Sequence, residues 1–115
     1  MKRRSILFGL LVLVACGGPS VAPELRPQFS LQLSANDSAF TPESLQVRGG
    51  VVNSIKMINF GQLDHNFSQT SLEIDTDIPA GRSRTITFRP ENRGTIEFFC
   101  KYHFGTGMKG TLTVS

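Results

Sequence analysis

The apolar residues of this chain occur in short segments in which they alternate with polar residues, and this alternation most constrains the fold. A period of two places the apolar side chains of a β-strand on one face. Six such segments follow residue 28: FSLQLSA (29–35), SLQV (44–47), VVNSIKMINF (51–60), TITF (85–88), TIEFFC (95–100) and TLTVS (111–115). Turn-forming Gly, Pro, Asn and Asp residues separate them, and no segment after residue 15 has the apolar period of a helix. The pattern predicts an all-β domain folded as an antiparallel β-sandwich.

The first fifteen residues, MKRRSILFGLLVLVA, have a different composition. They begin with Lys2, Arg3 and Arg4 and continue as an apolar run that only Gly9 interrupts. This arrangement is typical of a secretory signal peptide, and the run is short for a permanent membrane span. A buried amphipathic helix is the alternative, but no polar residue recurs at helical spacing within the run. We therefore predict that residues 1–15 direct export and are removed.

The signal segment ends in Leu13-Val14-Ala15-Cys16, which resembles the lipobox of bacterial lipoproteins. The resemblance implies that the Cys16 thiol receives a diacylglycerol, whereas the alternative is an unmodified thiol. Two or more acyl chains anchor a protein firmly, because each buried methylene contributes about 0.8 kcal/mol. Residues 16–28 would then form a Pro- and Gly-rich linker, and the folded domain would span residues 29–115. We expect a cell-envelope location, lipid-anchored to the outer face of the cytoplasmic membrane or to the outer membrane and facing the periplasm or exterior.

The charge balance indicates which partners to exclude. The chain has 12 Lys and Arg against 9 Asp and Glu, and three of the basic residues lie in the signal segment. The mature chain therefore has no formal net charge, and it has no basic run with interleaved aromatic residues. No nucleic-acid partner is expected.

The segment FFCKYHFGTGM brings together Cys100, His103 and Met108, spaced C-x2-H-x4-M. The other histidine of the chain, His65, follows the apolar segment 51–60, and we expect it in a loop at a strand end. Each histidine alone would more often be structural, and a methionine more often packs in a core. Two imidazoles, one thiolate and one weak thioether together are typical of mononuclear electron-transfer copper. Zinc is the alternative, although structural zinc usually takes four Cys or His ligands.

The spacing within this segment also has a mechanical interpretation. Cys100 ends an apolar strand, so a rigid sheet would hold its sulfur. Gly105 and Gly107 would let the backbone turn tightly and return Met108 to the site. Coordination would protect Cys100 in an oxidising compartment, since the only other cysteine, Cys16, is assigned to lipid.

Four stretches of the domain resemble the cupredoxins, blue copper proteins of the plastocyanin, pseudoazurin and amicyanin kind. They are AFTPESLQV (39–47), VVNSIKMINF (51–60) leading to DHNF (64–67), IPAGRSRTITF (78–88) and GTIEFFCKYHFGTGMKGTLTV (94–114). The C-x2-H-x4-M segment, followed by Lys-Gly and a strand, is the most specific part. The resemblance covers nearly the whole domain and implies a Greek-key β-sandwich that binds one copper ion, cycling between Cu(I) and Cu(II).

The resemblance also implies roles for individual residues. The implied copper ligands are His65, Cys100 and His103 in equatorial positions and Met108 in the axial one. Asn66 would stiffen the site through hydrogen bonds between the two ligand loops. His103 would be the surface port for electrons, with Phe104 and Leu63 in the apolar patch where partners dock. Lys101 and Tyr102, between Cys and His, indicate neither an acidic nor a basic docking surface.

The sequence thus predicts a monomeric, membrane-anchored carrier that transfers single electrons between redox partners such as a cytochrome or a copper or haem oxidoreductase. We do not expect an enzyme, because multicopper oxidases and copper nitrite reductases need further histidines. The alternative is a copper chaperone or delivery protein of the cell envelope. A structural or adhesive sandwich would leave the order of the four ligands unexplained.

Overall fold

The computed structural model describes residues 26–115. The predicted signal peptide, the predicted lipidation site Cys16 and most of the predicted linker lie outside these residues. Within them the strands are β1 (Phe29–Ala35), β2 (Phe40–Thr41), β3 (Ser44–Val47), β4 (Asn53–Asn59), β5 (His65–Gln69), β6 (Ile74–Ile78), β7 (Ser83–Phe88), β8 (Gly94–Phe99) and β9 (Lys109–Val114), with a short 3-10 helix, η2, at Phe104–Thr106. None of the helical residues described here forms a helix long and apolar enough to cross a membrane.

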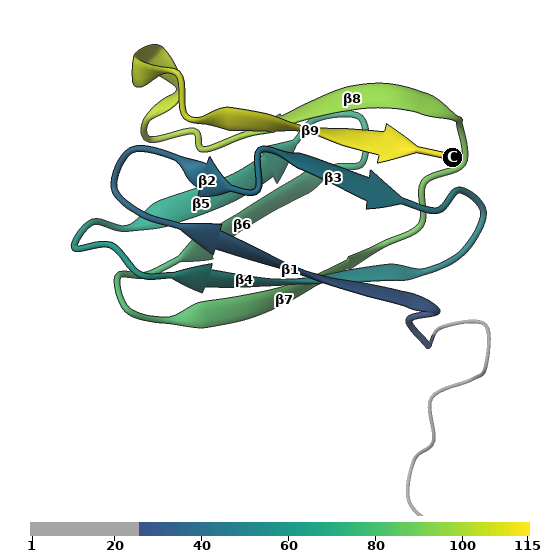
Figure 1. Ribbon diagram of the computed structural model, residues 1–115, viewed down its shortest axis with the longest axis horizontal. Helices are drawn as coiled ribbons and strands as arrows, with labels where there is room; N and C mark the ends of the chain where they lie inside the picture. Colours follow the sequence, from purple (N-terminus) through teal and green to yellow (C-terminus); the bar gives the residue numbers. More distant parts are fainter. Residues whose placement is uncertain (1–25) are drawn as a thin grey trace, which may run out of the picture.

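The strands form two sheets that pack face to face, so the predicted β-sandwich is confirmed (Figure 1). One sheet has the strand order β2-β1-β4-β7, and the other has the order β3-β9-β8-β5-β6. The buried apolar side chains of both sheets meet between the two layers. Figure 1 shows the β1–β2, β4–β5 and β8–β9 connections at one end of the sandwich, and the first described residues and the C-terminus at the other.

Two strand pairs are parallel, which corrects the expectation of a purely antiparallel sandwich. β1 pairs in parallel with β4, and β3 pairs in parallel with β9. The physical reason is that two reversals of direction separate β1 from β4: the chain turns back after β1 as β2, crosses to the second sheet as β3 and then returns as β4 beside β1 (Figure 1).

All six predicted strands are present, and three more were not predicted. β2 has two residues, which is too short for a periodic pattern. β5, with the sequence HNFSQ, is buried at every position, so its polar residues do not mark a solvent-facing side. β6, IDTDI, has apolar residues at both ends and polar residues between them. Aspartate is unfavourable in strands, so its two aspartates obscure the strand pattern.

Three phenylalanines pack against one another in the core between the sheets. The Phe67 and Phe98 rings stack with centroids 4.7 Å apart, and Phe40 meets Phe98 edge-on at 4.9 Å. Phe67 lies two residues after His65, and Phe98 lies two residues before Cys100. Because side chains alternate along a strand, the Phe67 side chain is on the same face as His65, and the Phe98 side chain is on the same face as Cys100.

Candidate metal centre

Three donor groups converge at one end of the sandwich. The Cys100 sulfur lies 3.9 Å from His65 Nδ1 and 3.4 Å from His103 Nδ1, and all three atoms lie within 4.8 Å of one another. Cys100 and His65 are fully buried, and His103 is half-buried. His65 is the first residue of β5, so the expectation that it lies in a loop was wrong. Its position on a strand fixes its direction more firmly than a loop would.

These separations fit one metal ion. Nitrogen and sulfur ligands bind a first-row ion at about 2.0 to 2.3 Å, so two ligands of one ion lie roughly 3 to 4 Å apart. Both histidines present Nδ1 to the sulfur, which leaves a shared point for an ion. A donor set of two imidazoles and one thiolate, with a methionine on the same loop, is the set that mononuclear copper prefers. The chemistry of the residues therefore fits copper.

Backbone hydrogen bonds tie the cysteine, the second histidine and the methionine into one loop. The Cys100 N–H donates to the Met108 carbonyl at 3.0 Å, and the His103 N–H donates to the Cys100 carbonyl at 3.1 Å. The Met108 N–H donates to the His103 carbonyl at 3.3 Å. Met108 is fully buried, so the loop returns its side chain to the interior beside Cys100.

The turn that closes this loop needs one glycine and not two. Gly107 has a φ of 88°, in the left-handed region that residues with a Cβ avoid. Gly105 lies inside η2 and outside that region, so the expectation that it is required for the turn was wrong. The 3-10 turn supplies the reversal that the sequence pattern attributed to Gly105.

A carboxylate contacts the His65 imidazole at the nitrogen that does not face Cys100. Asp37 Oδ1 lies 3.1 Å from His65 Nε2, and the carboxylate also accepts hydrogen bonds from the N–H groups of Gln62 at 2.9 Å and Leu63 at 3.1 Å. Those two N–H groups hold the pKa of the Asp37 carboxyl below its usual range. In the sequence, Asp37 is one of the turn-forming residues between two predicted strands. Its 28-residue separation from His65 gave no local signal of contact.

Asn66 links the two ligand-bearing segments. Its Nδ2 donates to Asp75 Oδ1 and to Asp77 Oδ1, both at 2.8 Å, and its Oδ1 accepts hydrogen bonds from the Ser68 hydroxyl and, at 3.3 Å, from the Lys101 N–H. Asn66 follows His65, and Lys101 follows Cys100. The bond between them therefore connects β5 to the loop of residues 100–108, called the Cys–His loop below, as the family resemblance implies.

Lys101 and Tyr102 attach the Cys–His loop to β6. The Lys101 ammonium lies 3.0 Å from Asp75, and the Tyr102 hydroxyl donates to Asp77 at 2.8 Å. Asn66 first, and then these two partners, lower the pKa of Asp75 and Asp77. In turn the Asp75 carboxylate raises the pKa of Lys101, and the Asp77 carboxylate raises that of Tyr102. From the sequence, Lys101 and Tyr102 were expected only as surface groups, and their attachment to β6 was not predicted.

Exposed apolar side chains surround the ligand end of the sandwich. Leu63 is 48% exposed in the connection before His65, and Phe104 is 49% exposed immediately after His103. Phe104 rests edge-on against Phe99, with ring centroids 5.2 Å apart. Phe60, the residue after β4, is 69% exposed and was not singled out from the sequence. Large apolar groups left in water at one end of a small domain are candidates for contact with another protein.

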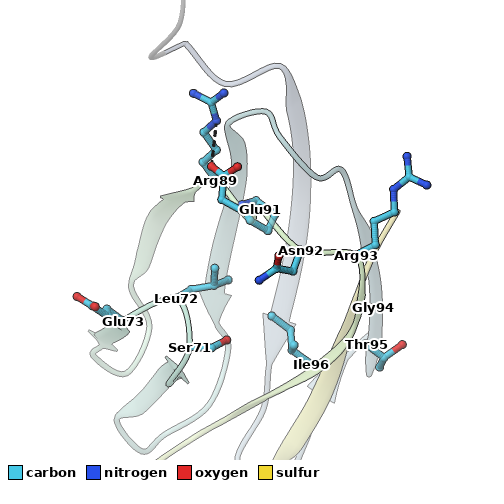
Figure 2. Close-up of a pocket in the computed structure, with 11 residues that line it drawn as sticks. Ser71, Leu72, Glu73, Arg89, Glu91, Asn92, Arg93, Gly94, Thr95 and Ile96 are labelled. Atoms are coloured by element: carbon cyan, nitrogen blue, oxygen red, sulfur yellow. Dashed lines mark ion pairs between the residues drawn. The ribbon is translucent and has the colours of Figure 1, made fainter.

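A groove of about 550 Å³ lies away from the ligand residues, between the β5–β6 turn and the β7–β8 connection. β5 begins at His65, so residues 71–73, which line the groove, lie beyond the far end of that strand. Figure 2 shows the Arg89 and Arg93 side chains directed away from its centre, with Arg89 paired to Glu91 at 3.5 Å. Its lining contains neither histidine nor cysteine, so the groove is not part of the metal centre.

A β-sandwich that brings two imidazoles and a thiol together at one end, with a methionine on the cysteine loop, belongs to the class of mononuclear copper proteins. Residues 6–114 match the Cupredoxin-like domain family, and the chain belongs to this family. The resemblance found in the sequence is thereby confirmed. Plastocyanin of Daucus carota is 33% identical over 99 residues, which span 74% of this chain and 98% of the carrot protein.

Solved structures with the same fold include auracyanin B, with a TM-score of 0.67 and 23% identity over 78% of this chain and 91% of that one. The metal-binding domain of the Cu(I)-exporting P-type ATPase of Streptococcus pneumoniae D39, solved with Cu(I), has a TM-score of 0.65 and 19% identity. That comparison covers 84% of this chain and 91% of the domain. At these identities the likeness concerns the fold alone.

Proposed function

We propose that this protein carries single electrons, with one copper ion held by His65, Cys100, His103 and Met108. When bound, copper supplies a one-electron couple between Cu(I) and Cu(II). The observation that carries the proposal is the convergence of a buried thiol and two imidazole Nδ1 atoms at 3.4 and 3.9 Å from the sulfur. A buried thiolate is costly unless a cation balances its charge, and a bound copper ion would do so.

Electron transfer is fast when the ligands move little between the two oxidation states. Here each ligand belongs to a strand, to a strand end or to a hydrogen-bonded loop. His65 is paired to Ile78 in the β5–β6 ladder, and Cys100 follows the end of β8. Backbone bonds close the loop that carries His103 and Met108. The protein therefore imposes one compromise geometry on both oxidation states.

We propose that electrons enter and leave through His103. Of the two imidazole ligands, His65 is fully buried and His103 is half-buried, so His103 is nearer to a docked partner. The exposed Phe104 follows it in the chain, and the exposed Leu63 and Phe60 lie in the segment that leads to the other ligand, His65. Its partners would be redox proteins such as a cytochrome or a copper or haem oxidoreductase, each bound briefly by a small apolar contact.

We also propose that the protein is a lipid-anchored monomer of the cell envelope, attached through Cys16 to the outer face of the cytoplasmic membrane or to the outer membrane. The placement of β1 supports this arrangement. Phe29 begins β1 at the end of the sandwich opposite the ligand loops (Figure 1). A tether of residues 16–28 would therefore leave the copper end free to meet partners.

The function is tested by titrating the purified protein with Cu(II) and recording the visible spectrum. We expect an intense thiolate-to-copper band that saturates at one copper per chain, bleaches with ascorbate and returns with ferricyanide. Cys100→Ser should abolish the band, and Cys16→Ser should retain it.

A colourless protein that binds Cu(I) alone and releases it readily would overturn the electron-carrier proposal and favour copper delivery. The burial of Cys100 and His65 argues against delivery, since an exchangeable site needs accessible donors.

The anchor is tested by mass spectrometry of the protein extracted from membranes. A diacylglyceryl group on Cys16 and no residues before it are expected, and Cys16→Ser should release the protein from the membrane fraction. A wild-type chain that stays in the soluble fraction with a free Cys16 would contradict the anchor and leave the copper site unaffected.

A further inference from the structure

Asp37 contacts the first histidine ligand on the side away from the thiol. Its Oδ1 lies 3.1 Å from His65 Nε2, and His65 Nδ1 faces the Cys100 sulfur at 3.9 Å. The carboxylate oxygen can only accept in this contact, so in the neutral ring the proton lies on Nε2 and Nδ1 keeps its lone pair. The contact therefore selects the tautomer that a metal on the Cys100 side requires.

The Asp37 carboxylate is held in place before any metal binds. Two backbone N–H groups of the β4–β5 connection, those of Gln62 and Leu63, donate to its two oxygens. On its own side of the contact, Asn36 Oδ1 accepts from the Ser38 N–H at 2.8 Å and the Ala39 N–H at 2.9 Å, which fixes the turn. Hydrogen bonds thus hold both the carboxylate and the turn that carries it, so the carboxylate keeps its direction at little entropic cost.

We propose that Asp37 is a positioning residue of the copper site, which acts through His65 to favour Cu(II) and lower the reduction potential. An anionic acceptor forms a stronger hydrogen bond than a neutral carbonyl and makes the imidazole a better electron donor at its other nitrogen. The oxidised ion gains more from a stronger donor than the reduced ion does. The inference rests on the proposed function, because it concerns the ion that the site would hold.

The chain offers a matched control for simple loss of charge. Asp64 immediately precedes His65, is exposed, and accepts a hydrogen bond from the Ala80 N–H at 3.0 Å. Neither imidazole is among its hydrogen-bond partners in the described part of the chain. Asp64→Asn therefore removes a negative charge close to the site without touching the bond to His65.

The experiment compares Asp37→Asn with Asp64→Asn in the copper-loaded protein. Asparagine keeps an acceptor oxygen at residue 37 but removes the charge. We expect Asp37→Asn to weaken Cu(II) binding by about 10- to 100-fold, the usual effect of losing such a partner. If Cu(I) binding is unchanged, each tenfold loss raises the potential by about 59 mV. Asp64→Asn should produce a clearly smaller rise.

A second measurement needs neither copper nor a variant. In the apoprotein, ¹⁵N NMR of the neutral His65 ring should show its proton on Nε2, and a proton on Nδ1 instead would overturn the inference even if Asp37→Asn failed to fold. Equal potential shifts in the two variants would also overturn it, because Asp37 would then act only through its charge. A wild-type protein that forms no copper band would contradict the proposed function instead, and the NMR result would still decide the Asp37 contact.

Discussion

At the residue scale, the His65 and Cys100 side chains have their directions determined by different neighbours. Asp37 sets the orientation of the His65 ring, and the β8 strand directs Cys100. Met108 has no partner of its own for its thioether among the hydrogen bonds described here, and its position follows from the loop that buries it. The role of Met108 as a ligand therefore follows least from its contacts, and a substitution tests that role directly.

Replacing Met108 by leucine should raise the reduction potential and keep the intense visible band. Leucine has nearly the same volume, so the packing cost is small, but it removes the weak axial donor that favours Cu(II). A redox titration followed by visible absorption measures both properties. Met57→Leu is the matched control, since Met57 is equally buried in β4. Identical potentials in the two variants would mean that Met108 serves only as core packing.

At the element scale, the site depends on how β8 and β9 meet and on how β5 is tied to the Cys–His loop. The β8–β9 ladder runs from Gly94 opposite Val114 to Phe99 opposite Lys109. Next to the last of these pairs, Phe98 lies opposite Gly110, and a Cβ at residue 110 would overlap the Phe98 ring and the Glu43 carbonyl. Because Gly110 has no side chain, the Phe98 ring of the aromatic core can pack against β9 next to the ligand loop.

Gly110→Ala should lower the free energy of unfolding by about 1 to 3 kcal/mol, the usual cost of forcing extra atoms into a packed region. Urea denaturation of the apoprotein measures this change. Gly105→Ala serves as the control, because a Cβ there meets open space in η2. A Gly110→Ala protein as stable as the Gly105→Ala protein would show that β9 can shift away from Phe98 at little cost.

Asn66→Ala should also lower the free energy of unfolding, by about 1 to 3 kcal/mol, because the variant leaves polar groups of β6 and the Cys–His loop without their partner. Copper should bind more weakly as well, since the tie between β5 and Lys101 is lost. Equilibrium denaturation and copper titration measure the two effects. Asn92→Ala, at an exposed position of the β7–β8 connection, should change neither. If both variants match the wild type, Asn66 does not stiffen the site.

At the scale of the whole molecule, three carboxylates with lowered pKa values lie around the ligand end. They are Asp37, Asp75 and Asp77. Their acceptor roles connect the β1–β2 turn, the β4–β5 connection, β6 and the Cys–His loop. The opposite end, where β1 begins, has no part in this network of contacts (Figure 1).

The lowered pKa values predict that the apoprotein loses stability in acid. A carboxyl whose folded pKa is below its unfolded value of about 3.9 stabilises the folded state above that value, and the contribution is lost as the pH falls through the folded pKa. The thermal unfolding midpoint should therefore be nearly constant from pH 7 to pH 5 and fall below pH 4. The double variant Asp75→Asn, Asp77→Asn should fall less steeply in acid. A double variant with the wild-type profile would show that other groups control the acid response.

The amount that could be predicted from sequence differed between parts of the fold. Strands such as β1 and β3 were predicted with the correct bounds because one side faces the core and the other faces water. β5 was missed because it is buried at every position, and its four polar residues find their partners in hydrogen bonds or at the metal site instead of in water. The parallel pairing of β1 with β4 has no local signal, since it depends on which sheet each strand joins.

The sequence alone determined the β-sandwich class and the set of donors, because both depend on residue types and on short spacings. Cys100, His103 and Met108 share one nine-residue loop, so covalent connectivity keeps them together. Only the tertiary structure decided that Asp37 contacts His65, that Lys101 and Tyr102 attach to β6, and that a 3-10 turn closes the ligand loop. These contacts join residues whose distance apart depends on how the strands are arranged between the two sheets, and no periodicity along the chain encodes that arrangement.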